Sequence, residues 1–334
     1  MPTYVCETCD KSFDQKGHFD THKSRKTPCK KKNTVEPLLK LTKPLTKPFL
    51  KWVGGKTQII ETVLSSFPKE FNNYYEPFLG GGSVLLGFLS YNTSFKGKVY
   101  ASDVNPNIIA LYKYIQTDCE AFIAQIKALV DTYNNIENKS VNRSAESLEE
   151  AATSQESYYY YMRQKYNTMD KTSMAGCATL LLLNKTCFRG VYREGPRGFN
   201  VPFGHYDSPA VYDETHLKEV SKLIQNVEFR CCGFEDTLKN IEENDFAYLD
   251  PPYAPETTTS FVNYVADGFT LDDHTKLFNL CKSMKARFLM SNAEVNLVID
   301  NFPTPKYTTK IISCRRAINA KDPSAKTNEV LIHS

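Results

Sequence analysis

The chain has 334 residues, which is enough for two or three folding units and one large buried core. Its 41 basic residues nearly balance 38 acidic ones, so the net charge of +3 does not by itself indicate a polyanionic partner. No apolar run approaches the roughly 20 residues that a membrane-spanning helix needs, and no apolar signal segment opens the chain. We therefore expect a soluble, intracellular protein, in which the ten cysteines favour metal binding over disulfides.

Residues 1–31 have the composition and spacing of a small zinc finger. Cys6, Cys9 and His22 are spaced as the first three ligands of a ββα finger. No His follows His22 at the usual spacing, so Cys29 is predicted as the fourth ligand. His18, one helical turn before His22, is the alternative ligand. These residues predict a structural Zn²⁺ site of three thiolates and one imidazole.

Phe13 and Phe19 fall where such a finger needs its two apolar core residues. Two phenylalanines cannot hold about 30 residues folded without metal, so zinc binding and folding should be one event. Basic residues flank the expected finger helix and favour contact with DNA, with contact to a protein as the alternative. These residues are Lys16, Lys23, Arg25 and Lys26. A linker rich in Pro, Thr and Lys is expected over residues 32–47.

From Pro48 onward the chain shows the strand–helix alternation of an α/β nucleotide-binding fold. A strand expected within Tyr74–Phe78 runs into Gly80–Gly82 and a helix follows. The next strand ends at Asp103, about 20 residues on, where an acid can bind ribose hydroxyls. An ordinary tight turn, with Asp103 as a helix N-cap, is compatible with the same pattern.

The α/β pattern is interrupted after residue 112 and resumes near residue 226. Residues 134–157 are polar and are expected to form an exposed insertion with a helical stretch at Ser147–Ala152. Residues 158–183 are expected to be largely helical, and residues 187–206 are rich in Gly, Arg and aromatics. Further strands are expected over 228–231, 246–249 and 287–290, with a helix over 272–284. The predicted domains are thus 1–31, 48–112 with 226–334, and 113–225 as an inserted region.

Asp250, Pro251, Pro252 and Tyr253 directly follow the apolar strand at 246–249. Two prolines restrict the backbone there and leave a carbonyl without a local donor. An acid, a free carbonyl and an aromatic ring suit methylation of an aromatic amino group. The Asp250 carboxylate and the Pro251 carbonyl would accept both amino hydrogens and free the nitrogen lone pair. Tyr253 would stack on a base flipped out of the duplex.

Four blocks in this order resemble the Dam-type DNA adenine methyltransferases, the alpha group of amino-methyltransferases. The blocks are Phe49–Lys56, Glu76–Gly82, Phe199–Gly204 and Asp250–Tyr253, and the resemblance covers roughly Pro48 to Leu331. It implies a Rossmann-like S-adenosylmethionine-dependent methyltransferase fold with an inserted, mainly helical target-recognition domain, to which this chain adds the ββα finger. It also implies adenine-N6 methylation of double-stranded DNA, with S-adenosylmethionine as the methyl donor.

The resemblance carries over roles for individual residues. Those implied to bind the cofactor are Trp52, Lys56, Phe78, Gly80, Gly82, Asp103 and Asp250. A recognition hairpin is implied at 183–193, and the implied DNA-binding residues are Phe188, Arg189, Arg193 and His205. Arg193 matches an arginine that reads guanine in members acting on GATC. Arg189 and His205 depart from the usual Asn and Arg, so GATC is the leading expectation for the recognition sequence rather than a requirement.

Three substrates on the same fold remain as alternatives: cytosine-N4 in DNA, adenine in RNA, and a protein amide. An acid at the first position of the Asp250–Tyr253 motif favours adenine in DNA. A DNA-binding regulator with an inactive methyltransferase domain is the alternative from another functional class. A monomer or weak dimer is expected, because one flipped base needs one catalytic site. The finger leaves open whether its partner is DNA or protein.

Overall fold

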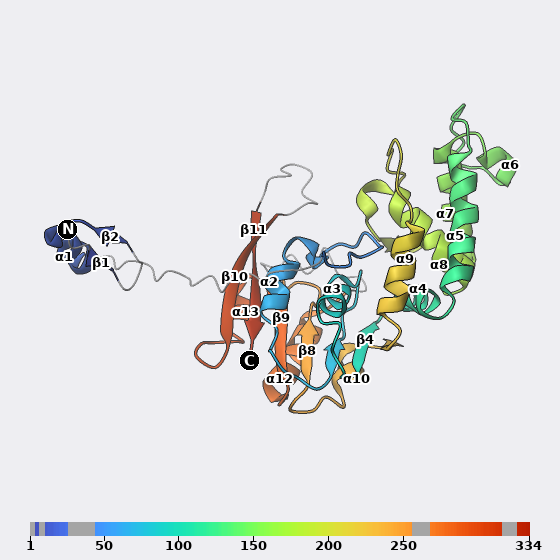
Figure 1. Ribbon diagram of the computed structural model, residues 1–334. Helices are drawn as coiled ribbons and strands as arrows, with labels where there is room; N and C mark the ends of the chain where they lie inside the picture. Colours follow the sequence, from blue (N-terminus) through green and yellow to red (C-terminus); the bar gives the residue numbers. More distant parts are fainter. Residues whose placement is uncertain (1–3, 7–10, 26–43, 256–267, 316–325) are drawn as a thin grey trace. The chain divides into compact units, whose positions relative to one another are not determined.

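The computed structural model describes residues 4–6, 11–25, 44–255, 268–315 and 326–334 (Figure 1). The chain divides into two compact units, residues 1–40 and residues 41–334. In the small unit, strand β1 (Tyr4–Val5) pairs antiparallel with β2 (Ser12–Phe13), and helix α1 (Lys16–Ser24) follows. The described residues of this unit therefore have the ββα order expected from the sequence.

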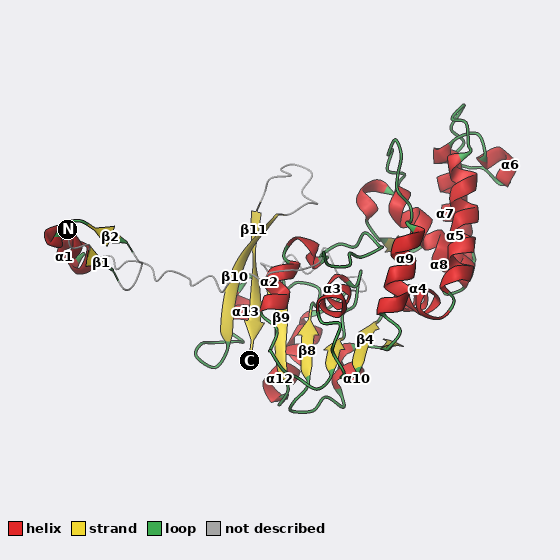
Figure 2. Ribbon diagram, in the orientation of Figure 1, coloured by secondary structure: helices red, strands yellow, loops and turns green. Residues whose placement is uncertain are grey.

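One mixed sheet forms the centre of the large unit (Figure 2). Its strands in the described residues are β3 (Tyr74–Glu76), β4 (Val99–Asp103), β7 (Val227–Cys231), β8 (Phe246–Leu249), β9 (Arg287–Ala293), β10 (Thr308–Arg315) and β11 (Lys326–His333). Their spatial order is β10-β11-β9-β8-β3-β4-β7. The strands from β9 to β7 pair in parallel, whereas β11 and β10 add to β9 as antiparallel strands. A mostly parallel sheet of this kind is consistent with the expected methyltransferase fold.

The helices of the large unit precede β3, connect these strands, or lie beyond the β4–β7 edge (Figure 1). Their bounds are η1 (Lys56–Gln58), α2 (Ile60–Ser65), α3 (Ser83–Tyr91), α4 (Pro106–Thr117), α5 (Cys119–Asn134), α6 (Leu148–Ala151), α7 (Gln155–Thr168), α8 (Met174–Thr186), η2 (Phe188–Gly190), α9 (Glu214–Leu223), α10 (Phe234–Leu238), α12 (Leu271–Ser283) and α13 (Asn296–Ile299). A short hairpin joins β5 (Glu194–Gly195) to β6 (Gly198–Phe199). Helices α5, α7 and α8 pack together (Figure 1). Within the described residues, no helix combines the length and apolarity needed to span a bilayer.

Strand β8 shows how both faces of the sheet are covered. Phe246 and Tyr248 point to the face where Phe67 packs. The centroid of the Phe67 ring lies 4.6 Å from that of Phe246 and 6.0 Å from that of Tyr248. Ala247 and Leu249 alternate to the other face and join the core cluster that contains residues of α12. Side chains of successive strand residues point to opposite faces, so a parallel strand covered on both sides is apolar throughout.

The expected strands and helices of the α/β pattern are confirmed, and β9 extends three residues beyond its predicted end. The polar insertion is helical at Leu148–Ala151, as predicted, but the expectation that it is exposed is wrong in part. Ala151, Ser154 and Ser157 are buried. The Ser157 hydroxyl accepts the Asn142 N–H at 2.7 Å, and Ser154 caps α7. Polar residues are buried here because their polar groups are hydrogen-bonded.

Candidate functional site

Two predicted site residues, Asp103 and Asp250, lie at the carboxyl ends of the parallel strands together with Glu76. Glu76 ends β3, Asp103 ends β4, and Asp250 follows β8 directly. These three strands are neighbours in the sheet, in the order β8-β3-β4. Three acidic side chains that are far apart in sequence therefore lie along one edge of the sheet, where open α/β folds bind their ligands.

The glycine loop after β3 has backbone angles that favour glycine. Gly80 and Gly82 have φ of 48° and 66°, in the left-handed region. A Cβ atom on Gly80 would lie 2.9 Å from Cδ1 of Trp52, and one on Gly82 would collide with the Tyr112 hydroxyl. Glycine is therefore required both for the turn and for the close packing of Trp52, which the sequence placed at the same site.

Asp103 holds this loop to the end of β4. Its carboxylate accepts the Gly80 N–H and the Asn105 N–H, each at 2.9 Å. Burial raises the pKa of Asp103, and these two hydrogen bonds oppose that rise. Asn105, rather than Asp103, caps α4, because its side chain accepts the Asn107 N–H. The alternative interpretation of Asp103 as an N-cap is therefore wrong.

An aromatic cluster lies beside the glycine loop. The Phe78 ring stacks on Phe234 at 5.7 Å between centroids and meets Phe269 edge-on at 5.8 Å. Phe78 and Phe269 are partly buried, and Phe234 begins α10 just after β7. The sequence interpretation identified Phe78 but missed the other two rings, because nothing in their local sequence distinguishes them from ordinary core residues. Such a cluster offers flat apolar surface to an aromatic ligand.

Lys56 and Asp250 form an ion pair across the site. The Nζ atom of Lys56 lies 2.7 Å from Oδ2 of Asp250 and also donates to the Gly54 carbonyl. The Lys56 side chain is 3% exposed and the Asp250 side chain 20%. Burial raises the pKa of Asp250, while the adjacent ammonium group opposes that rise. The pair therefore favours an ionised Asp250 in surroundings that would otherwise promote its protonation.

Tyr253 completes the group. Nζ of Lys56 lies 5.1 Å from the centre of the Tyr253 ring, and the Tyr253 hydroxyl donates to Oε2 of Glu329 at 2.8 Å. Pro251 is buried, whereas Pro252 is exposed. The structure thus brings together Lys56, Asp250 and Tyr253, which the sequence had placed in one site. It adds Glu329, to which the sequence interpretation gave no role.

Glu76, at the end of β3, is a second carboxyl group at this edge of the sheet, and the sequence pattern gave it no role. It is 2% exposed, and the Tyr74 hydroxyl donates to its Oε2 at 2.6 Å. Burial raises the pKa of Glu76 to about 8, against the lowering effect of the Tyr74 hydrogen bond, and the negative charge of Asp250 raises it further. At neutral pH this carboxyl group is therefore mainly protonated, and, unlike Asp250, it forms no ion pair with Lys56.

The residues predicted to bind DNA lie on two segments that run side by side. The Phe188 N–H donates to the Pro202 carbonyl at 2.8 Å, and the Gly204 N–H donates to the Thr186 carbonyl. Phe188 is 48% exposed. The predicted hairpin over 183–193 is misplaced, because residues up to 186 continue α8 and the hairpin is β5–β6. Helix α8 runs three residues beyond the helical end predicted at 183 and stops just before the Gly- and Arg-rich stretch.

The remaining predicted DNA contacts, Arg189, Arg193 and His205, are also exposed. Arg189 and His205 have positive φ angles of 57° and 51°. Arg193 donates to the Asn200 side chain at 2.6 Å, which fixes it beside β6. The structure therefore presents an aromatic ring and three basic or titratable side chains from neighbouring loops. This surface has the composition expected for contacts to bases and phosphates.

The described part of the predicted zinc finger is packed around two of its four expected ligands. Cys6 and His22 are buried, at 2% and 8% exposed, and the His22 ring lies 4.9 Å from Phe13. His18 is exposed, which favours His22 as the ligand. Cys9 and Cys29 lie outside the described residues, and no group of three potential ligands occurs within them. The four-ligand prediction therefore stays a prediction.

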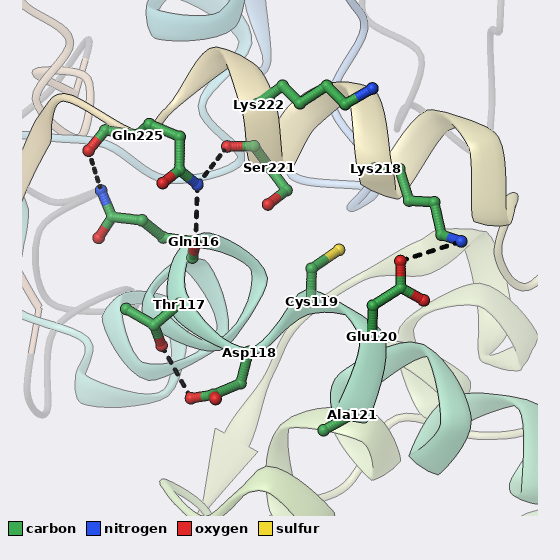
Figure 3. A pocket seen from close by; sticks show the side chains of 10 residues that line it. All are labelled: Gln116, Thr117, Asp118, Cys119, Glu120, Ala121, Lys218, Ser221, Lys222 and Gln225. Atoms are coloured by element: carbon green, nitrogen blue, oxygen red, sulfur yellow. Dashed lines mark hydrogen bonds and ion pairs between the residues drawn. The ribbon is translucent and has the colours of Figure 1, made fainter.

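A polar cavity of about 730 Å³ lies elsewhere, between the α4–α5 junction and α9 (Figure 3). Lys218 pairs with Glu120 at 3.0 Å, and Gln225 donates to the Gln116 carbonyl at 2.8 Å. None of the predicted site residues lines this cavity. Its polar groups pair with one another, so it adds nothing to the site at the sheet edge.

Comparison with known proteins gives a consistent result. Residues 52–317 match the family described as D12 class N6 adenine-specific DNA methyltransferase. The type II methyltransferase M.MjaIII of Methanocaldococcus jannaschii is 34% identical over 292 residues, covering 84% of this chain and 95% of that protein. A DNA adenine methylase of Vibrio cholerae is 33% identical, over 72% of this chain and 77% of that protein. One from Haemophilus influenzae is 29% identical, over 84% and 86%.

Proposed function

We propose how Asp250, Pro251 and Tyr253 act in this chain, which belongs to the D12 class N6 adenine-specific DNA methyltransferase family. The protein is an adenine-specific DNA methyltransferase, and DNA is its substrate. S-adenosylmethionine is the cofactor expected for this family. The observation that carries the residue roles is the Lys56–Asp250 ion pair beside Tyr253 at the carboxyl edge of the sheet.

The residues at the sheet edge fit S-adenosylmethionine. The Phe78 cluster would hold the adenine ring, and Asp103 would accept hydrogen bonds from the ribose hydroxyls. Gly80 and Gly82 keep side chains out of the loop, where Trp52 packs. When bound, the cofactor supplies an electrophilic methyl group on a positively charged sulfur. The Asp250 carboxylate provides the complementary negative charge, and Lys56 holds that carboxylate in place.

The target amino group needs help to react, because its lone pair is delocalised into the purine ring. Asp250 accepts one N6 hydrogen and the Pro251 carbonyl accepts the other, which leaves the lone pair available for methyl transfer. One carboxylate oxygen, Oδ2, is already bonded to Lys56, so Oδ1 is the acceptor left for the amino group. Tyr253 stacks on the adenine once the base has left the duplex.

The test of these roles is transfer of labelled methyl from S-adenosylmethionine to unmethylated plasmid, followed by nucleoside analysis. The wild type should produce N6-methyladenine, and Asp250→Ala should lose turnover while its circular dichroism spectrum is unchanged. Asp300→Ala changes an exposed acid that directly follows α13. It is the control and should remain active. Substantial turnover by Asp250→Ala would refute the proposed role. Label found on cytosine would show that the target base is cytosine rather than adenine.

Target recognition is assigned to Phe188, Arg189, Arg193 and His205, with GATC as the proposed recognition sequence. Their exposure on adjoining loops supports this proposal. An arginine pairs with guanine through two hydrogen bonds, so Arg193→Ala should weaken discrimination at one guanine by about 1–3 kcal/mol. Methylation-sensitive mapping of plasmid treated by wild type and variant tests both statements. Methylation mapped mainly to other sequences would refute GATC.

The N-terminal unit is proposed to be a zinc finger that binds DNA through its basic helix. The ligands would be Cys6, Cys9, His22 and Cys29, and the burial of Cys6 and His22 next to Phe13 supports this assignment. Zinc content per protein should fall in Cys9→Ser, and affinity for DNA should fall with it. Activity on short duplexes at saturating concentration should persist. Unchanged zinc content would refute the ligand set, and unchanged DNA affinity would indicate a protein partner.

A further inference from the structure

The hydroxyl end of Tyr253 is bonded to a strand that the catalytic motif does not otherwise involve. Its Oη donates to Oε2 of Glu329 at 2.8 Å, across 76 residues of sequence. Glu329 lies on β11, where it is opposite Ile312 of β10 and Ala293 of β9. A strand paired on both sides moves little, because hydrogen bonds to two neighbours hold its backbone. The acceptor for the Tyr253 hydroxyl is therefore fixed by the sheet.

The next strand, β9, holds the backbone just after the motif. Oδ1 of Asn292 accepts the Ala254 N–H at 3.0 Å and the Ala293 N–H at 2.8 Å. The Asn292 side chain is fully buried, and its Nδ2 has no hydrogen-bond partner among the described residues. Asn292 on β9 is directly opposite Val330 on β11, next to Glu329. Adjacent positions of two antiparallel strands thus hold the backbone and the ring of one catalytic segment.

The Tyr253 ring needs such support, because its surroundings on the motif side constrain it weakly. Pro252 before it is exposed, and the ring itself is only half-buried. Nζ of Lys56 lies 5.1 Å from the ring centre and attracts the ring through its quadrupole, but this interaction fixes no rotation about the ring axis. The hydrogen bond at the hydroxyl holds the far end of the side chain. Because a phenolic O–H lies in the plane of its ring, the direction of this bond also favours one orientation of that plane.

We infer that Glu329 is a positioning residue that holds the Tyr253 ring in the orientation in which it stacks on the target adenine. This inference rests on the proposed role of Tyr253 in base stacking. Glu329 does not touch the reacting atoms; it acts through the tyrosine hydroxyl. The antiparallel strands β9 and β11 thereby contribute to catalysis, although the cofactor residues all lie on or near the parallel part of the sheet.

A double-mutant cycle tests the inference, with the rate of a single turnover at saturating DNA and S-adenosylmethionine as readout. Tyr253→Phe and Glu329→Ala should each slow methyl transfer about ten- to a hundredfold, because each removes the same hydrogen bond. The double variant should be no slower than either single variant. Asn328→Ala, at the neighbouring exposed position of β11, is the control and should keep the wild-type rate.

Glu329→Gln separates the hydrogen bond from the charge. The amide oxygen still accepts from the Tyr253 hydroxyl, so the variant should recover most of the wild-type rate. A Gln variant as slow as the Ala variant would show that the carboxylate acts by its charge on the site, and would overturn the positioning role. If Glu329→Ala does not fold, Glu329→Met preserves the bulk of the side chain in the same cycle.

The failure of this inference differs from the failure of the proposed function. A wild type that methylates DNA, together with a Glu329→Ala variant that is equally fast, overturns the inference alone. Losses that multiply in the double variant also overturn it, because independent contributions multiply in this way. A wild type that transfers no methyl to DNA overturns the proposed function, and the inference with it.

Discussion

The raised pKa of the buried Glu76 carboxyl group should make the stability of the protein depend on pH in an unusual way. It is almost completely buried at the end of β3, and its pKa is raised by burial from 4.5 to about 8. Replacement by Gln keeps the shape and an oxygen that can accept from the Tyr74 hydroxyl, but removes the titrating proton. We expect Glu76→Gln to gain stability relative to the wild type as the pH rises.

The sign follows from proton binding. Between pH 4.5 and about 8 the folded protein keeps the proton on Glu76, whereas the unfolded chain releases it. The folded state then binds more protons, so the free energy of unfolding of the wild type falls as the pH rises. Each pH unit in this window lowers the free energy of unfolding of the wild type by about 1.4 kcal/mol. The total loss above pH 8 is roughly 5 kcal/mol. Below pH 4.5 Glu76 is protonated in both the folded and the unfolded state, so none of this stability is lost there.

Urea unfolding at pH 5.5 and pH 8.5 measures this effect. The difference in free energy of unfolding, variant minus wild type, should increase by several kcal/mol between the two pH values. Other titrating groups act in both proteins and cancel in that difference. Glu61→Gln, which changes an exposed carboxyl group of α2, should show no such increase. A difference for Glu76→Gln that stays constant or falls with pH would refute the assignment of a buried, protonated Glu76.

Two further predictions concern the ion pair and the glycine loop. Lys56→Met removes the cation that opposes the burial-driven rise in the pKa of Asp250, so the acid limb of the pH–rate profile should move to higher pH. Single-turnover rates over the pH range measure it, and an acid limb that does not move would contradict the pairing. Gly82→Ala should lower the free energy of unfolding by about 1–3 kcal/mol, because of its positive φ and the collision with Tyr112. Thermal unfolding checks this against Gly233→Ala, whose Cβ would meet no atom within 4 Å and which should be far milder.

Local patterns were sufficient to predict most of the elements near the site. Gly80–Gly82 between a strand and a helix indicated the loop, and the apolar run at 246–249 before Asp250 indicated β8. These signals are local because backbone angles, alternation and helix capping depend on a few neighbouring residues. The insertion was predicted less well, because polar composition does not reveal that Ser154 and Ser157 satisfy one another and nearby backbone groups.

The family resemblance, carried by short blocks of sequence, indicated which residues to expect in the catalytic site. It could not show how those residues are paired. Lys56 and Asp250 are 194 positions apart, and they meet because η1, which packs against α3, carries Lys56 to the residue that follows β8. The same holds for Tyr253 and Glu329, which meet because β11 adds antiparallel to β9.

The sequence by itself therefore indicated the order of elements, the position of the Asp250–Tyr253 motif after a strand, and the acids Asp103 and Asp250 at strand ends. Tertiary structure alone decided which carboxyl group has a cation beside it that favours its ionised form. Glu76 and Asp250 are both acids at neighbouring strand ends, yet only Asp250 pairs with Lys56, while Glu76 is bonded to the Tyr74 hydroxyl. The charge of a carboxyl group depends on burial and on charges within a few ångströms, and those are fixed by packing between distant parts of the chain.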